Sequence, residues 1–337
     1  MEFLDPTLPG SSGSLLPRWR GLGRARLLAA ALLVIPVATA AAESEARMPI
    51  CAIDMGSNSF KRIVGSFEKG RYDQKKLEKK TLGVGDDLSR NGRISDGKLA
   101  EIEATLSAFK AACAKEGAAH VVAIGTAAFR EAPNGARAVE IAAKLGIPME
   151  IATEKRESEL AYLVGSLGGD GYAVIDNGSR SIELVSKEPG QAPRYSVFNQ
   201  GYRVAYQEFF AAAVDAGPAI RAFRDRVKQE AVSAPFMKGK RKLVGVEFEE
   251  LAEVLFPPDE TEGRVFTREE LKQRLDEIAT SSAEEFLALK QKEDIDRALP
   301  RLVVAATLAE EFGYAGFELT ARELGTGLII EAGMQRP

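Results

Sequence analysis

The 337-residue chain is poor in residue types that build many active sites: it has one histidine, two cysteines and one tryptophan. The single histidine, His120, excludes zinc sites made of several histidines, and a catalytic triad would have to be built on it. Cys51 and Cys113 have neither paired nor metal-like spacing, so we predict that both are small core residues. The body of the chain lacks a block of lysine and arginine, and the formal net charge is -4, which argues against a nucleic-acid partner.

What the chain has is the composition of a globular protein. Hydrophobic residues make up 45% and charged residues 28%. A length of 337 residues is too great for one ordinary core and predicts two domains.

Residues 1–47 differ from the rest. Four arginines between positions 18 and 26 precede an apolar run over 27–37, and small residues follow at 38–42. This order predicts a secretory signal peptide, hence an exported protein, periplasmic or secreted, with no stable membrane span after cleavage. Two alternatives stay open: an uncleaved anchor, or upstream sequence before a true start at Met48, which would leave the protein cytoplasmic.

Two segments of the same design follow apolar strands. The first places Asp54, Gly56, Ser57, Asn58 and Ser59 after an apolar run over 50–53, and an apolar pattern resumes at residue 60. This predicts a β-hairpin whose glycine turns the backbone and whose amides and polar side chains can bind an anion. As an isolated match, an ordinary polar turn would be the better explanation.

The second segment places Asp176, Gly178, Ser179, Arg180 and Ser181 after the apolar run over 172–175. Two such hairpins about 120 residues apart predict an internal duplication, with two similar halves facing each other across a cleft. Between them, strands alternate with helices, which predicts sheets covered by helices.

Two further segments between the hairpins carry charge. A glycine-rich loop is predicted over 83–95, with Arg93 near its end and Ser95 capping a helix. Thr153 begins a second predicted helix, whose first turns hold Glu154, Glu157 and Glu159. The helix dipole favours such glutamates even in the absence of a function.

With these motifs, the chain resembles the exopolyphosphatase/guanosine pentaphosphate phosphohydrolase (Ppx/GppA) family over roughly residues 48 to 330. That family belongs to the actin-like, sugar-kinase-like and Hsp70-like fold group. The resemblance implies an α/β protein of two ribonuclease-H-like domains, at 48–167 and 168–337, with a ligand cleft between them.

The resemblance also implies roles for individual residues. Glu157 would be the catalytic base that orients the attacking water, with Asp54 as a second catalytic group. Asp54 and Asp176 would support Mg²⁺ through water. The remaining expected residues would bind phosphate: Gly56, Ser57, Asn58, Ser59, Arg93, Gly178, Ser179, Arg180 and Ser181.

The chain departs from the family pattern in its C-terminal half. The second hairpin of the family reads Asp-x-Gly-Gly-Gly-Ser-Thr-Glu, whereas Ser179 and Arg180 replace two of the glycines here. Arg180 would either contact phosphate or fill space and pair with Glu157 or Asp176. A Gly-Gly-Thr loop expected after a strand is replaced by an acidic segment beginning at Glu247.

Two hypotheses therefore remain. The protein is a phosphoanhydride hydrolase that releases phosphate from inorganic polyphosphate or a similar polyanion, or it is a catalytically impaired relative that binds a phosphate-rich ligand or a protein partner. The sequence does not predict the oligomeric state.

Overall fold

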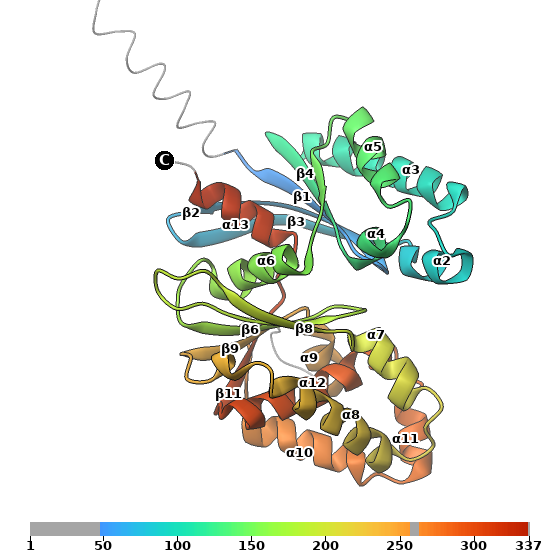
Figure 1. Ribbon diagram of the computed structural model, residues 1–337, viewed down its shortest axis with the longest axis vertical. Coiled ribbons are helices and arrows are strands. Elements are labelled where there is room, and N and C mark those ends of the chain that lie inside the picture. Colours follow the sequence, from blue (N-terminus) through green and yellow to red (C-terminus); the bar gives the residue numbers. More distant parts are fainter. Residues whose placement is uncertain (1–47, 257–262, 336–337) are drawn as a thin grey trace, which may run out of the picture. The chain divides into compact units, whose positions relative to one another are not determined.

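The computed structural model describes residues 48–256 and 263–335 (Figure 1). The predicted signal peptide, residues 1–47, lies outside the described residues. Every helix in the described part is too short or too polar to cross a bilayer.

The first sheet has five strands in the order β3-β2-β1-β4-β5. Strands β1 to β3 form an antiparallel meander, whereas β4 and β5 run parallel to β1. Every residue of β1 is buried, as expected for a central strand with both faces covered. The strands are β1 (Ile50–Met55), β2 (Ser59–Glu68), β3 (Arg71–Thr81), β4 (His120–Gly125) and β5 (Met149–Ile151).

Helices α3 and α5 contribute apolar side chains to the core on one face of this sheet. The side chain of Ser95 accepts the amide of Lys98 and so caps α3, as the sequence predicted. The helices that follow these strands are α2 (Val84–Asn91), α3 (Asp96–Lys115), α4 (Ala127–Glu131) and α5 (Ala136–Lys144).

The second sheet has six strands in the order β10-β11-β9-β6-β7-β8. The series β8-β7-β6-β9-β11 repeats the order and the strand directions of the first sheet, and β10 adds an antiparallel edge. The predicted α/β fold with two related sheets is therefore confirmed. The strands are β6 (Tyr172–Asn177), β7 (Ile182–Ser186), β8 (Arg194–Phe198), β9 (Lys242–Val246), β10 (Val265–Thr267) and β11 (Gly316–Thr320).

The largest core cluster lies on one face of this second sheet, where α12 is buried almost throughout. The helices of this part are α7 (Tyr202–Ala205), which continues as a π-helix (Tyr206–Phe210), α8 (Ala216–Ala231), α9 (Glu249–Leu255), α10 (Arg268–Ala279), α11 (Ala283–Leu289) and α12 (Ile295–Phe312).

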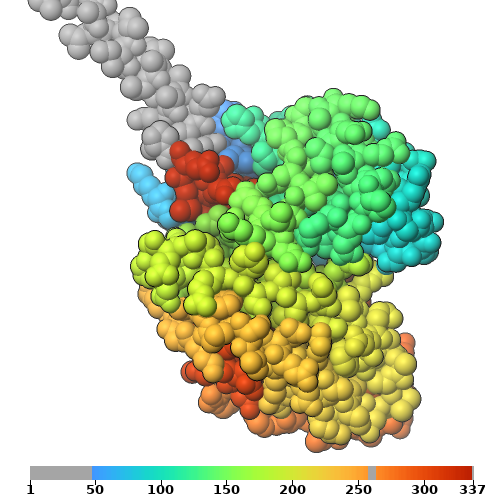
Figure 2. Space-filling view, in the orientation of Figure 1, coloured from blue at the N-terminus to red at the C-terminus, as the bar shows by residue number. Residues whose placement is uncertain are grey.

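Two helices join the sheets. Helix α6 (Glu154–Ser166) packs against β6 and β7, and helix α13 (Thr326–Met334) packs against α6, β2 and β1. The last helix therefore returns to the first sheet, and Figure 2 shows its red surface beside the blue strands. The predicted division at residue 167 stays a prediction, and α13 is a segment beyond that boundary that contacts the first sheet.

A disulfide joins Cys51 on β1 to Cys113 on α3. Both cysteines are fully buried, as predicted, but the prediction that they are unpaired is wrong. The two residues are 62 positions apart, and the packing of α3 against the sheet brings their Cα atoms to 5.9 Å. That distance suits a disulfide, and it depends on a tertiary contact that no local spacing reveals.

The glycine-rich segment after β3 is also different from the prediction. Residues 84–91 form α2 rather than a loop, and Gly92, with φ 66°, ends the helix in the left-handed region. The Asp87 carboxylate accepts the backbone amide of Ser95 at 2.7 Å and its hydroxyl at 2.9 Å, which fixes the start of α3 against the end of α2.

Candidate functional site

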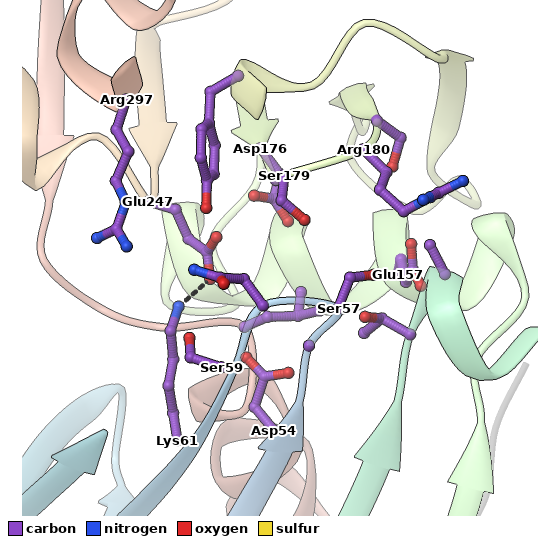
Figure 3. Close-up of a pocket in the computed structure, with 18 of the residues that line it drawn as sticks. Asp54, Ser57, Ser59, Lys61, Glu157, Asp176, Ser179, Arg180, Glu247 and Arg297 are labelled. Atoms are coloured by element: carbon purple, nitrogen blue, oxygen red, sulfur yellow. Dashed lines mark hydrogen bonds and ion pairs between the residues drawn. The ribbon is translucent and has the colours of Figure 1, made fainter. Parts of the chain in front are cut away.

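The two predicted hairpins meet at one cavity with a volume of about 80 Å³ (Figure 3). It lies where β1 turns into β2 and where β6 turns into β7. All the residues predicted to act in catalysis, metal binding or phosphate binding line it except Arg93. The lining residues from these predictions are Asp54, Gly56, Ser57, Asn58, Ser59, Glu157, Asp176, Gly178, Ser179, Arg180 and Ser181.

The tip of the first hairpin is held from behind through its carbonyl groups. The carbonyl of Ser57 accepts the amide of Gly85 at 2.7 Å, and the carbonyl of Asn58 accepts the amides of Leu82 and Gly83 at 2.9 and 2.8 Å. The hydroxyl of Ser57 accepts the amide of Ala128 on α4 at 3.2 Å. These bonds fix the turn without using the backbone amides of Ser57 and Asn58.

The second hairpin tip is held in the same way by the start of α7. The carbonyls of Gly178, Ser179 and Arg180 accept the amides of Tyr202, Arg203 and Gly201 at 3.0, 3.2 and 3.0 Å, respectively.

Four backbone amides at the two hairpin tips have no hydrogen-bond acceptor in the described part of the chain. Within residues 48–256 and 263–335, the N–H groups of Ser57, Asn58, Ser179 and Arg180 donate to no other residue. All four residues line the cavity. Backbone N–H groups that point into a concave turn can donate hydrogen bonds to a phosphate, and here two such turns face one cavity.

Glu157 reaches the cavity from the first turn of α6. The side chain of Thr153 accepts the amide of Arg156 and begins the helix, as predicted, so that Glu157 points inward and is buried. Burial raises the pKa of the Glu157 carboxyl, whereas Arg130, whose guanidinium donates to it at 2.7 Å, opposes this rise. A buried carboxylate held by one arginine is suited to orient a water and accept its proton.

Three more buried carboxyl groups lie around it. Burial raises the pKa of Asp54 to about 7, with Lys61 opposing the rise. Burial also raises the pKa of Asp176 far above its usual value and that of Glu183 to about 8, and neighbouring carboxylates add to both rises. One carboxylate oxygen of Asp176 and one of Glu183 are buried without a hydrogen-bond partner in the described part of the chain.

Lys61 on β2 joins the two halves of the site. Its ammonium contacts the carboxylate of Glu247, after β9 (Figure 3). It also contacts the carboxylate of Glu323, before α13. Burial alone would raise the pKa of Glu247, but Lys61 and Arg301 lower it to about 2. Burial raises the pKa of Glu323 despite the same lysine. One ammonium therefore contacts two carboxyl groups whose pKa values change in opposite directions, lowered for Glu247 and raised for Glu323.

Glu247 also has an unfavourable backbone. Its φ of 60° lies in the left-handed region, which costs a residue with a side chain roughly 1–2 kcal/mol relative to the ordinary helical region. A glycine would adopt this conformation without that cost.

Helix α12 supplies two further cations. Arg301 is almost fully buried, contacts Glu250 and donates to the carbonyl of Asn177 at 3.2 Å. Arg297 donates to the same glutamate at 3.0 Å, and the ring of Tyr202 lies 4.7 Å from the Arg301 guanidinium carbon. The cavity wall is thus a network of alternating charges.

A family model described as the Ppx/GppA phosphatase family matches residues 74–327, which is most of the chain. The chain belongs to the Ppx/GppA phosphatase family. No curated protein sequence matches it significantly.

Solved structures of the Ppx/GppA family share the fold. A crystal structure of the Aquifex aeolicus family member has a TM-score of 0.72 and 20% identity, and the match covers 86% of this chain and 98% of that one. A crystal structure of an exopolyphosphatase from Cytophaga hutchinsonii has a TM-score of 0.68 and 19% identity, with 86% and 99% coverage.

Arg93 is the one predicted residue that the structure places away from the cavity of this Ppx/GppA protein. Its side chain is half exposed and donates to Asp96 at 3.0 Å. The prediction placed Arg93 at the end of a loop on the ligand, but α2 and its glycine end turn this residue toward solvent.

Arg180 does not form the predicted pair with Glu157 or Asp176, and its contact with phosphate stays a prediction. Its guanidinium donates to both carboxylate oxygens of Glu131 on α4, at 3.1 and 2.6 Å, and so contacts neither Glu157 nor Asp176 (Figure 3). The side chain lies at the edge of the cavity with about a third of its surface exposed.

The residues fit a hydrated cation better than a directly bound one. Within the described ranges, no group of three or more histidine, cysteine, aspartate or glutamate side chains is placed so that it could hold a metal ion directly. Asp54 and Asp176 nevertheless face one cavity, and the orphaned oxygen of Asp176 has a lone pair to offer. Hard cations such as Mg²⁺ usually keep several waters and bind one or two carboxylates.

The predicted catalytic, metal-binding and phosphate-binding residues do not include six that the structure places at the site: Lys61, Glu183, Glu247, Glu323, Arg297 and Arg301. A signal was present for two of them: Glu183 stands where the family's hairpin ends in glutamate, and Glu247 stands in place of a glycine. The others come from segments far from either hairpin or carry no motif of their own.

Proposed function

We propose that the protein is a phosphoanhydride hydrolase that releases terminal phosphate from inorganic polyphosphate. The observation that supports this most is the pair of hairpin tips, whose four unused amides line a cavity of about 80 Å³ beside the buried carboxyl of Glu157. A cavity of that size holds several waters and so has room for one phosphoryl group.

In this proposal the tips bind the equatorial oxygens of the terminal phosphate. Glu157 orients a water for in-line attack on phosphorus and accepts its proton. The new P–O bond forms as the bond to the bridging oxygen breaks, and the shortened chain leaves with the electron pair. Mg²⁺, when bound, would offset phosphate charge, and Asp54 and Asp176 would hold it through water.

Export is part of the proposal. The disulfide between Cys51 and Cys113 supports it, because disulfides persist in oxidising compartments and are rare in the cytosol. An exported enzyme would meet polyphosphate but not guanosine pentaphosphate, which is a cytoplasmic signal.

A catalytically impaired relative that binds a phosphate-rich ligand is the second candidate. It is favoured by Glu247, whose ionised carboxylate already pairs with Lys61 in the cavity and would repel phosphate.

Phosphate release from polyphosphate separates the two candidates. The mature protein with Mg²⁺ should release orthophosphate from polyphosphate at a rate that depends on enzyme concentration. Tight binding of polyphosphate without any release would support the second candidate, and neither binding nor release would contradict both.

A further inference from the structure

A second cavity of about 450 Å³ adjoins the first. The two cavities share Ser57, Asn58, Ser179 and Arg180, so the second continues from the hairpin tips. Its other walls are residues of α2 on one side and of α7 and the π-helix on the other. A chain whose terminal phosphate occupies the first cavity has this larger space directly behind it.

Two arginines of the second half line this larger cavity, Arg180 and Arg203. The guanidinium of Arg203 pairs with both carboxylate oxygens of Asp86, at 2.8 and 2.9 Å, and lies 3.5 Å from the side-chain oxygen of Asn58. Arg180 donates through two nitrogens, one to each carboxylate oxygen of Glu131, whereas Arg203 contacts both oxygens of Asp86 through one nitrogen. Each planar fork is thus held in place by a carboxylate of the opposite half.

These two ion pairs are weak, so a phosphate chain can displace the carboxylates from the arginines. The four side chains are between about a third and a half exposed, and ion pairs that water can reach contribute little to stability. A phosphate presents the same two-oxygen geometry to a guanidinium and carries more charge. The ion pairs therefore orient the two guanidinium groups, and a phosphate ligand that displaces the carboxylates loses little binding free energy in breaking them.

We propose that Arg180 and Arg203 form a second anion subsite, which binds the second and third phosphates of an inorganic phosphate chain. This inference rests on the proposed function, because it assumes that the terminal phosphate lies at the hairpin tips. It also gives a role to Arg180, which stands where the family pattern has glycine: its charge replaces contacts that bare backbone would otherwise make. The substrate class is then a chain of at least three phosphates.

Isothermal titration of orthophosphate, pyrophosphate and tripolyphosphate tests the subsite. All variants are prepared in a Glu157→Gln background so that ligands are not consumed. The test variants are Arg203→Ala, Arg203→Lys and Arg180→Ala. The matched control is Arg137→Ala, since Arg137 is also ion-paired, with Asp96 at 2.7 Å, but lies outside both cavities.

Tripolyphosphate should bind the parent at least ~10-fold more tightly than orthophosphate, and Arg203→Ala or Arg180→Ala should remove most of this gain, since each loses a charge-assisted hydrogen bond. Arg203→Lys should recover only part of it, because lysine lacks the fork. Orthophosphate affinity should stay the same in Arg203→Ala, Arg203→Lys and Arg137→Ala. In the active protein the two alanine variants should raise KM for tripolyphosphate with little change in kcat.

The outcomes are distinguishable. Tripolyphosphate affinity that is equal in the parent, Arg180→Ala and Arg203→Ala overturns the subsite and leaves the proposed function standing. A loss that is equally large in Arg137→Ala also overturns it, since net charge alone would explain the effect. No binding of any of the three ligands at millimolar concentration overturns the proposed function itself.

Discussion

Substitution of Glu183 by glutamine should change how stability depends on pH. Glu183 is buried, one of its carboxylate oxygens has no partner in the described residues, and burial with the nearby Glu157 raises its pKa from 4.5 to about 8. The folded protein therefore binds a proton here that the unfolded chain releases above pH 4.5. Below pH 4.5 the raised pKa of Glu183 does not change the free energy of unfolding, and between pH 4.5 and 8 it lowers that free energy progressively.

A pKa that is higher by one in the folded protein than in the unfolded chain corresponds to about 1.4 kcal/mol, so the raised pKa of Glu183 makes the free energy of unfolding smaller by up to roughly 5 kcal/mol above pH 8. Glutamine has nearly the same shape and no charge to release. The free energy of unfolding of Glu183→Gln should thus match that of the wild type near pH 4.5 and exceed it by several kcal/mol at pH 8.5.

Urea unfolding in EDTA at pH 4.5, 6.5 and 8.5 measures this difference. The exposed Glu103 on α3 provides the control, and Glu103→Gln should follow the wild type at all three pH values. A difference between Glu183→Gln and the wild type that does not vary with pH would refute the reasoning, since it would mean that Glu183 is ionised in the folded protein throughout.

The other predictions concern three further features. Glu247→Gly and Glu247→Ala should both bind tripolyphosphate more tightly than the wild type, because each frees Lys61 from one carboxylate. In urea unfolding, Glu247→Gly should be more stable than Glu247→Ala by about 1 kcal/mol, because residue 247 has a left-handed backbone. Equal stability of the two variants would show that this backbone is unstrained. Replacing both Cys51 and Cys113 by alanine should lower the free energy of unfolding by about 4 kcal/mol, the loop-closure value for 62 residues, and added reductant should then have no effect; a wild type insensitive to reductant and as stable as the variant would contradict the disulfide. Residues 1–47 fused to a reporter that is active only outside the cytoplasm should give signal; a silent reporter, or native protein beginning at Met48, would contradict export.

The hairpins could be predicted because each is a local pattern. A buried apolar strand, an aspartate, a glycine and small polar residues determine a turn within about ten residues, and the Asp54 and Asp176 segments both lie in the cavity. Thr153 likewise predicts where its helix begins, but only the family resemblance separated Glu157 from Glu154 and Glu159.

The remaining parts depend on contacts between distant segments. Lys61 lies 186 residues from Glu247 and 262 from Glu323, and no spacing in the sequence indicates that they meet. The disulfide, likewise, requires α3 to pack on β1. Arg93 was misplaced because the family resemblance assigned it to phosphate, whereas the buried side chains of Val84 and Leu88 stabilise α2 against the core and Arg93, beyond its end, is half exposed.

Glu157→Gln provides the most direct test of the central claim, that the cavity at the hairpin tips aligns a terminal phosphate with a water held by Glu157. The substitution keeps the shape of the side chain and removes its charge and its basicity. We predict that phosphate release from polyphosphate falls by at least ~100-fold, the scale of general base catalysis, while the Kd for tripolyphosphate changes less than ~3-fold. Equal rates of phosphate release by the wild type and Glu157→Gln would contradict the account.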